Sequence, residues 1–90
     1  MKNVTVITGG TGGMGFAIAN SFGKQGPVLL CDLNEESLQT SVEILIRQNI
    51  DAHYIVTDVS KRQQVEVALE KALTLGNLKN VVHTDRKSVV

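Results

Sequence analysis

Residues 8–15 read TGGTGGMG, a stretch of eight residues that contains five glycines. The β-branched segment 3–8 leads into it, and Met14, Ile18 and Phe22 recur after it at every fourth position, as one face of a helix does. The order of strand, glycine turn and helix brings bare main-chain N–H groups to a helix N-terminus, where a phosphate group binds well. The sequence therefore predicts a phosphate-binding turn at this junction.

Three glycine spacings fit the turn and the string alone leaves them open. They are Gly9, Gly13 and Gly15 as TGxxxGxG, Gly9, Gly12 and Gly15 as GxxGxxG, and Gly10, Gly12 and Gly15 as GxGxxG. A P-loop is excluded, because Phe16 stands where that motif needs a lysine. A methyltransferase turn is a weaker alternative, since such turns usually follow an acidic strand end and this chain has Thr8 there. A flexible turn without a ligand is the plain alternative.

The rest of the chain repeats the alternation of strand and helix. Segment 28–31 is apolar on both faces, as an interior parallel strand is, and Cys31 within it is expected to be a small buried hydrophobe. Strands are predicted at residues 3–8, 28–31, 52–56 and 79–84. This order predicts an α/β fold with a doubly wound parallel sheet, truncated at about four strands and three helices, in the strand order 3-2-1-4.

The predicted helices have recognisable ends and apolar stripes. Gly23, Gly26 and Pro27 close the first helix, Asn34 caps the second, and a capping box of Ser60 and Gln63 begins the third, which Gly76 ends. The expected buried stripes are Leu38, Val42 and Leu45 in the second helix and Val65, Leu69, Ala72 and Leu73 in the third.

Composition narrows the function classes. Nine basic and nine acidic side chains give a formal net charge of zero, and aromatic residues make up 3% of the chain. We therefore expect neither a nucleic-acid partner nor a membrane partner. The chain shows no hydrophobic leader or spanning segment, and Cys31 is its single cysteine, so we expect a cytoplasmic protein. Ninety residues form one small domain at most.

The TGxxxGxG spacing, with Asp32 after the second strand and Asp58-Val59 after the third, resembles the short-chain dehydrogenase/reductase (SDR) family. The resemblance extends over nearly the whole chain and implies a Rossmann-like domain that binds NAD or NADP. It implies that Gly15 permits close helix packing, and that the pyrophosphate is lined by the backbone around Gly9, Thr11, Gly12, Gly13 and Met14.

Asp32 stands 17 residues after Gly15 and closes the second strand. A carboxylate there accepts hydrogen bonds from both adenosine ribose hydroxyls and repels a 2′-phosphate. No Lys or Arg lies between Gly9 and Gly15, and Leu33 rather than a basic residue follows Asp32, so we expect NAD, with NADP less favoured. The alternative is that Asp32 only caps the next helix, although Asn34 is better placed for that.

The same resemblance assigns Asp58 and Val59 to the adenine amino group and ring. His83 begins a turn that reads Asn-Asn-Ala-Gly in the family and lies near the nicotinamide ribose, so His83 is expected to contact the cofactor; Thr84 takes the second position. For Asp58 the plain alternative is a second cap ahead of Ser60.

The family's chemistry uses a tyrosine, a lysine four residues later and a serine. Tyr54 is the only tyrosine and has Asp58 four residues on, so we assign no catalytic residue. His53 and His83 lack neighbours at metal-ligand spacing, so we assign no metal site and interpret His53 as structural.

These residues predict the N-terminal cofactor-binding fragment of an NAD-dependent oxidoreductase for an alcohol or carbonyl substrate, inactive by itself. A small-molecule substrate and a homo-oligomer are expected only of the full-length protein. The alternative, which the GxxGxxG spacing keeps open, is a fragment of an NAD(P)-binding sensor or an epimerase-like SDR without hydride transfer of its own.

Residues 85–90 read DRKSVV and are expected to be a non-native tail on a cofactor domain of residues 1–84. DRKSVV is the translation of GATCGGAAGAGCGTCGTG, a common sequencing-adapter string. Asp85 and Arg86 also place charges where the family has small residues. The alternative is a genuine basic tail.

Overall fold

A computed structural model describes residues 2–9 and 12–84, so Thr11 and the predicted tail at 85–90 lie outside the described residues. Four strands, β1 (Asn3–Thr8), β2 (Val28–Asp32), β3 (Ala52–Val56) and β4 (Asn77–His83), alternate with three helices, α1 (Gly13–Phe22), α2 (Glu35–Arg47) and α3 (Arg62–Leu75). The strands form one parallel sheet in the order β3-β2-β1-β4. This confirms the predicted α/β fold and its strand order.

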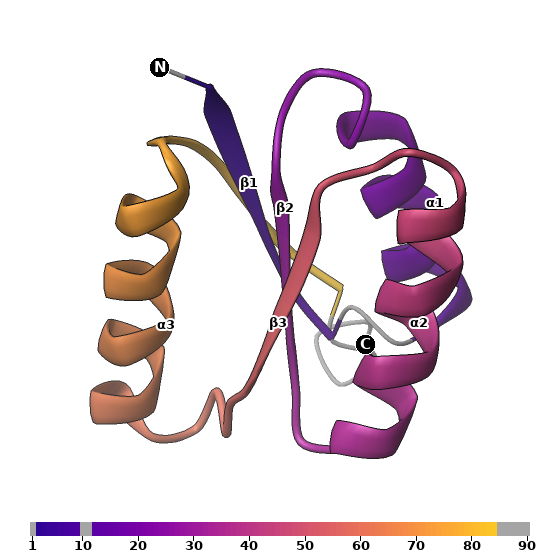
Figure 1. Ribbon diagram of the computed structural model, residues 1–90. Coiled ribbons are helices and arrows are strands. Elements are labelled where there is room, and N and C mark those ends of the chain that lie inside the picture. Colours follow the sequence, from indigo (N-terminus) through magenta and orange to yellow (C-terminus); the bar gives the residue numbers. More distant parts are fainter. Residues whose placement is uncertain (1, 10–11, 85–90) are drawn as a thin grey trace.

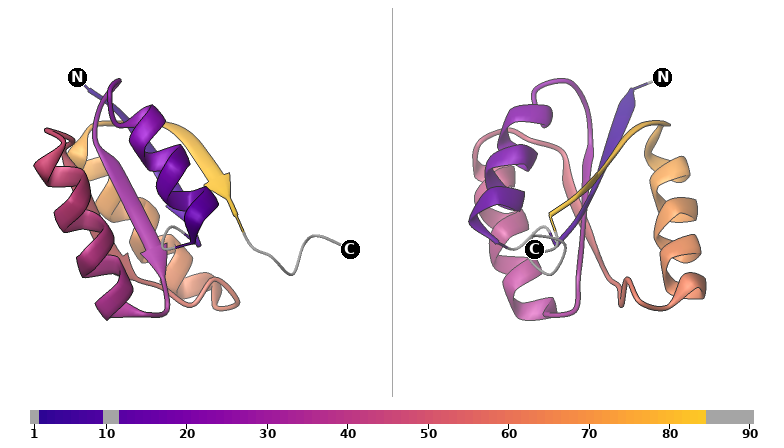
Figure 2. Two further views of the ribbon diagram at one scale, coloured as in Figure 1. Left: turned by 90° about the vertical axis from the view of Figure 1, so that its right-hand side faces the viewer. Right: turned by 180° about the vertical axis from the view of Figure 1, so that it is seen from behind.

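The molecule has three layers. Helices α1 and α2 lie together on one face of the sheet and α3 lies on the other (Figure 1), and the view from behind shows the same layers (Figure 2). Among the described residues, no helix is both long enough and apolar enough to cross a membrane.

A buried core fills the space on each face of the sheet. Every residue of the segment 28–31 is fully buried, as expected for an interior parallel strand. The α1 and α2 face buries Ile7, Ala19, Val28, Leu30, Leu38, Val42, Leu45, Ile50 and Ala52. The α3 face buries Val4, Val6, Leu29, Cys31, Ala68 and Ala72. The predicted stripe of α2 is therefore confirmed, as is the burial of Cys31.

The predicted stripe of α1 is only partly correct. Ile18 and Phe22 pack against the core, but Met14 is 70% exposed. The buried residues of this helix are Gly15, which has no side chain, and Ala19, which has only a methyl group, so the helix backbone can come close to the sheet.

Helix α3 differs more from its prediction. It begins at Arg62 with Lys61 as N-cap and no capping side chain, so the predicted box of Ser60 and Gln63 is wrong. Ala68 and Ala72 are buried, whereas Leu73 is 58% exposed. In the described part of the chain, α3 is the only helix on its face of the sheet. No second helix packs beside it there, so the side of α3 that carries Leu73 stays exposed.

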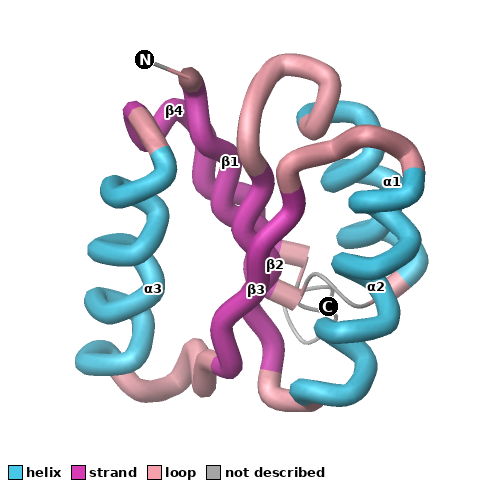
Figure 3. The backbone as a smooth tube through the Cα atoms, viewed as in Figure 1, coloured by secondary structure: helices cyan, strands magenta, loops and turns pink. Residues whose placement is uncertain are grey.

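Strand β4 begins two residues earlier than predicted, at Asn77, and ends at His83. Asn77 N–H donates to Lys2 O at 2.8 Å, which aligns the start of β4 with β1. The register with β1 shifts between Val4 and Thr5, opposite Lys79. Within the described sheet β4 is an edge strand (Figure 3), and its residues alternate between exposed and half-buried.

Leu30→Ala is expected to lower the free energy of unfolding by about 2–5 kcal/mol, because it leaves a cavity at a fully buried position of the core. The matched control, Leu73→Ala, removes the same atoms from an exposed position and is expected to change stability by no more than about 0.5 kcal/mol. Urea unfolding followed by circular dichroism measures both. Equal losses in the two variants would contradict this description of α3 and the core.

Candidate functional site

Because all the strands are parallel, their carboxyl ends lie at one edge of the sheet. Three backbone hydrogen bonds continue beyond the strand ends: Gly9 N–H to Cys31 O (2.8 Å), Thr57 N–H to Asp32 O (2.8 Å) and Thr84 N–H to Thr8 O (3.0 Å). These bonds align the segments that follow each strand. The glycine turn, Asp32, Asp58 and His83 are thereby brought to the same edge, which is where ligands bind in open parallel sheets.

The glycine turn begins at Gly9, whose φ of +73° lies in the left-handed region that favours glycine. Gly12 is the N-cap of α1, with φ −73° and ψ 164°, and it has no side chain to cap the helix. The first helical bond runs from Phe16 N–H to Gly12 O at 2.9 Å, and the first turn of α1 contains no acidic residue. The helix thus presents N–H groups and the positive end of its dipole without an anionic side chain of its own.

The space in front of this helix end suits a phosphate group. Among the described residues, and apart from its own chain neighbours and the helix backbone, a Cβ added at Gly13 would meet no atom within 4 Å, so the described structure leaves the space beside Gly13 open. Gly15 is buried, as close packing of the helix requires. Bare amides, a helix dipole and open space are together what a diphosphate needs, so the residues present fit a dinucleotide at this position.

Asp32 is half-buried at the end of β2, and its Oδ1 accepts the Leu33 N–H at 2.7 Å. The cap of α2 is Asn34, whose Oδ1 accepts Ser37 N–H at 3.0 Å. Capping of α2 is therefore done by Asn34, as the sequence predicts. Leu33 is 64% exposed beside the carboxylate.

Asp58 lies in the segment between β3 and α3, and its carboxylate is held by that segment. Its Oδ1 accepts hydrogen bonds from Ser60 N–H at 3.0 Å and from the Ser60 hydroxyl at 2.6 Å. Its own N–H donates to Gln64 Oε1 at 2.7 Å. The Ser60 hydroxyl, and then the Ser60 N–H, lower the pKa of Asp58 below its usual value. The contact of Asp58 with adenine stays a prediction, as does that of Val59, which is exposed.

His83 ends β4 beside the end of β1. Its Nδ1 lies 2.7 Å from Thr8 Oγ1, and its side chain is exposed. The next residue, Thr84, donates its hydroxyl to Thr8 O at 2.7 Å or to Gly9 O at 2.8 Å. The sequence patterns did not single out Thr84 as a site residue; the only signal was its place in the turn after the fourth strand.

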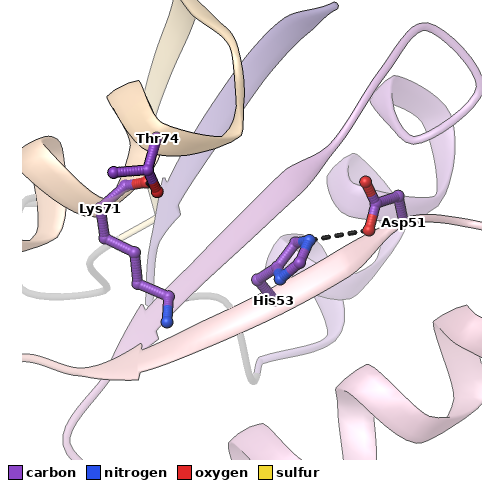
Figure 4. A network of polar contacts seen from close by, with 4 residues as sticks. All are labelled: Asp51, His53, Lys71 and Thr74. Atoms are coloured by element: carbon purple, nitrogen blue, oxygen red, sulfur yellow. Dashed lines mark hydrogen bonds and ion pairs between the residues drawn. The ribbon is translucent and has the colours of Figure 1, made fainter.

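Other reactive groups lie outside this edge or are unreactive. Burial raises the pKa of the Cys31 thiol to about 11, so it is a poor nucleophile near neutral pH. His53 Nε2 lies 2.7 Å from Oδ1 of Asp51, the residue just before β3 (Figure 4), so this histidine has a local partner. The described residues contain no group of three or more His, Cys, Asp or Glu side chains that could hold a metal ion.

A comparison with protein families shows to which family the chain belongs. The family described as short chain dehydrogenase matches residues 3–84. The chain belongs to the short-chain dehydrogenase family, as its motifs indicate.

Curated relatives are much longer than this chain. An uncharacterised oxidoreductase, YxjF, from Bacillus subtilis is 38% identical over 65 residues, covering 71% of this chain and 25% of that protein. The short-chain dehydrogenase reductase ATA1 from Arabidopsis thaliana is 37% identical over 73 residues, covering 80% of this chain and 25% of that protein. The chain thus spans about a quarter of the length of these relatives.

Solved structures agree with the fold. A variant of actinorhodin polyketide ketoreductase with NADPH superimposes with a TM-score of 0.86 at 28% identity, covering 92% of this chain and 33% of that one. A short-chain dehydrogenase/reductase from Burkholderia phymatum in complex with NAD has a TM-score of 0.83 at 30% identity, covering 89% and 29%. These similarities confirm a Rossmann-like fold of the SDR type.

Ser60→Ala is expected to raise the pKa of Asp58 toward its ordinary value, because it removes the shorter of the two hydrogen bonds to the carboxylate. A lowered pKa stabilises the fold fully above the unfolded value of about 4, and this contribution is lost as pH falls through the folded pKa. The variant should therefore lose less stability on acidification. Titration of the carboxyl carbon by NMR measures the shift, with Ser37→Ala as control. An unchanged Asp58 titration in Ser60→Ala would contradict the role given to Ser60.

Proposed function

We propose that this chain binds NAD as the N-terminal cofactor-binding part of an NAD-dependent short-chain oxidoreductase that acts on an alcohol or carbonyl substrate. The observation that carries the proposal is the open, uncapped N-terminus of α1 behind Gly9, at the same edge of the sheet as Asp32. Family membership supports it, as do solved relatives with NAD and with NADPH.

In this proposal, different residues contact different parts of the dinucleotide. The pyrophosphate lies on the backbone of the glycine turn, which the proposal takes to be Gly9, Thr11, Gly12, Gly13 and Met14, with Thr11 outside the described residues. Asp32 accepts hydrogen bonds from the adenosine ribose hydroxyls, and the exposed Leu33 lies beside it. Asp58 and Val59 contact the adenine, and His83 contacts the cofactor near the nicotinamide ribose.

The preference for NAD rests on charge. The relatives include proteins solved with NADPH and with NAD, so the family leaves both cofactors open. In this chain a carboxylate closes β2, and the nearest basic residue after it in the sequence is Arg47, at the far end of α2. A 2′-phosphate at Asp32 would therefore meet a like charge, with no cation supplied by the neighbouring sequence.

In this proposal the chain binds and orients, and the bound nicotinamide supplies the hydride chemistry. We propose that the tyrosine, lysine and serine that the family uses lie in the remainder of a longer protein, since this chain spans about a quarter of the length of its relatives. The small-molecule substrate, homo-oligomeric state and cytoplasmic location are proposed for that whole protein. Residues 85–90 are proposed to be a non-native tail, and the family match runs to residue 84.

Titration of the chain with NAD and with NADP is expected to show tighter binding of NAD, by about tenfold or more, since hydrogen bonds to a charged group contribute about 1.5–3 kcal/mol. Asp32→Ala should weaken NAD binding by a similar factor and bring the two cofactors close to equal affinity. NMR chemical-shift titration suits the weak affinity expected of an isolated chain.

The matched control is Glu43→Ala, which removes the same charge from an exposed position further along α2. It should leave the preference for NAD unchanged. Equal affinity of the unaltered chain for both cofactors would refute the role of Asp32. Binding of neither cofactor would refute the proposed function itself.

A further inference from the structure

We propose that Thr84 is a positioning residue whose hydroxyl holds the glycine turn in the shape that receives the pyrophosphate. This inference rests on the proposed dinucleotide-binding function and adds a residue from the far edge of the sheet to that site. It starts from the hydrogen bonds that Thr84 makes with the two residues at the end of β1.

Gly9 is held from two sides. Its N–H donates to Cys31 O of β2 at 2.8 Å, and its carbonyl oxygen lies 2.8 Å from the Thr84 hydroxyl, which follows β4. A Cβ built on Gly9 would lie only 2.6 Å from Thr84 Oγ1. The hydroxyl thus occupies the space that the missing side chain of Gly9 leaves, while φ of +73° is itself one that glycine adopts readily.

The Gly9 carbonyl has little other support among the described residues. Gly12 N–H donates to Gly9 O at 3.4 Å, which is a long hydrogen bond. Thr8 O, the other acceptor within reach of the hydroxyl, already accepts Thr84 N–H at 3.0 Å. A hydrogen bond from the hydroxyl to Gly9 O therefore adds more than one to Thr8 O, because Gly9 O has only the long bond from Gly12 among the described residues.

The consequence for binding is preorganisation. Each residue of a turn that must be ordered on binding subtracts conformational entropy from the affinity. A hydroxyl that orders Gly9 before the ligand arrives removes part of that cost. Thr84 acts through the backbone of the turn, so its effect should appear in the affinity and in the turn's mobility.

Thr84→Val isolates the hydroxyl, because valine has nearly the same shape. The Thr84 N–H bond to Thr8 O and the 2.7 Å contact between Thr8 Oγ1 and His83 Nδ1 do not involve the Thr84 hydroxyl, so both should persist in this variant. Thr84→Ser retains the hydroxyl and should behave like the unaltered chain. Thr74→Val is the control for loss of a hydroxyl elsewhere, since Thr74 donates to Lys71 O at 2.6 Å within α3 (Figure 4).

The experiment uses the full 90-residue chain, labelled with ¹⁵N, titrated with NAD and followed by NMR. Thr84→Val is expected to weaken NAD binding by about three- to tenfold, the size of one neutral hydrogen bond. In the protein without NAD it is also expected to speed hydrogen exchange at the amides of Gly9, Gly12 and Gly13. Thr84→Ser and Thr74→Val should change neither quantity appreciably.

The two readouts separate this inference from the proposed function. If the unaltered chain binds NAD and Thr84→Val binds equally well with unchanged amide exchange, the inference is overturned and the proposed function stands. If the unaltered chain binds no dinucleotide, the proposed function fails, and the affinity role of Thr84 fails with it. Should Thr84→Val not fold, the hydroxyl proton of Thr84 in the unaltered chain decides. A cross-peak from it to the Gly9 α protons supports the positioning role of Thr84, and rapid exchange of this proton with water overturns that role.

Discussion

Burial of the central strands on both faces is the constraint on which the structure depends. The segment 28–31 is fully buried between α1 and α2 on one side and α3 on the other, and β1 is nearly so. Helices that alternate with strands, and that cover both faces, require crossover connections and hence parallel strands. Parallel strands end at one edge, so the glycine turn, Asp32 and Asp58 meet there although they are far apart in the sequence. The geometry of the site therefore follows from the packing of the core.

In the proposed function, local polarity rather than net charge attracts the dinucleotide to that edge. The chain carries a formal net charge of zero, so long-range steering of an anion is weak. The first turn of α1 contributes N–H groups and a partial positive charge over a short range. Asp32 lies at the end of the neighbouring strand, where in the proposed function its carboxylate favours ribose hydroxyl groups over a 2′-phosphate. A dinucleotide matches both features, with a diphosphate at one point and a ribose at the other.

Much of the fold could be predicted from the sequence, because the alternating apolar periods and the glycine and proline breaks are local. The start of β4 differed because a partner distant in the chain sets it, and the start of α3 differed because a local turn precedes it. Strand β4 starts at Asn77 because its N–H bonds to Lys2 O. Helix α3 starts at Arg62, after a turn that Asp58 forms with Ser60, and it buries alanines while Leu73 stays exposed. Helical periodicity specified a face of α3 but not how closely that face approaches the sheet.

The sequence by itself determined the class of fold, the glycine turn before α1, and a carboxylate at the end of the second strand, since each depends on residue types at short spacings. Only the tertiary structure decided what each side chain contacts. It turned the Asp58 carboxylate toward Ser60, joined His83 to Thr8, and placed the Thr84 hydroxyl against Gly9. The last two contacts join residues about 75 positions apart, and such pairings arise from strand order, which brings β4 beside β1.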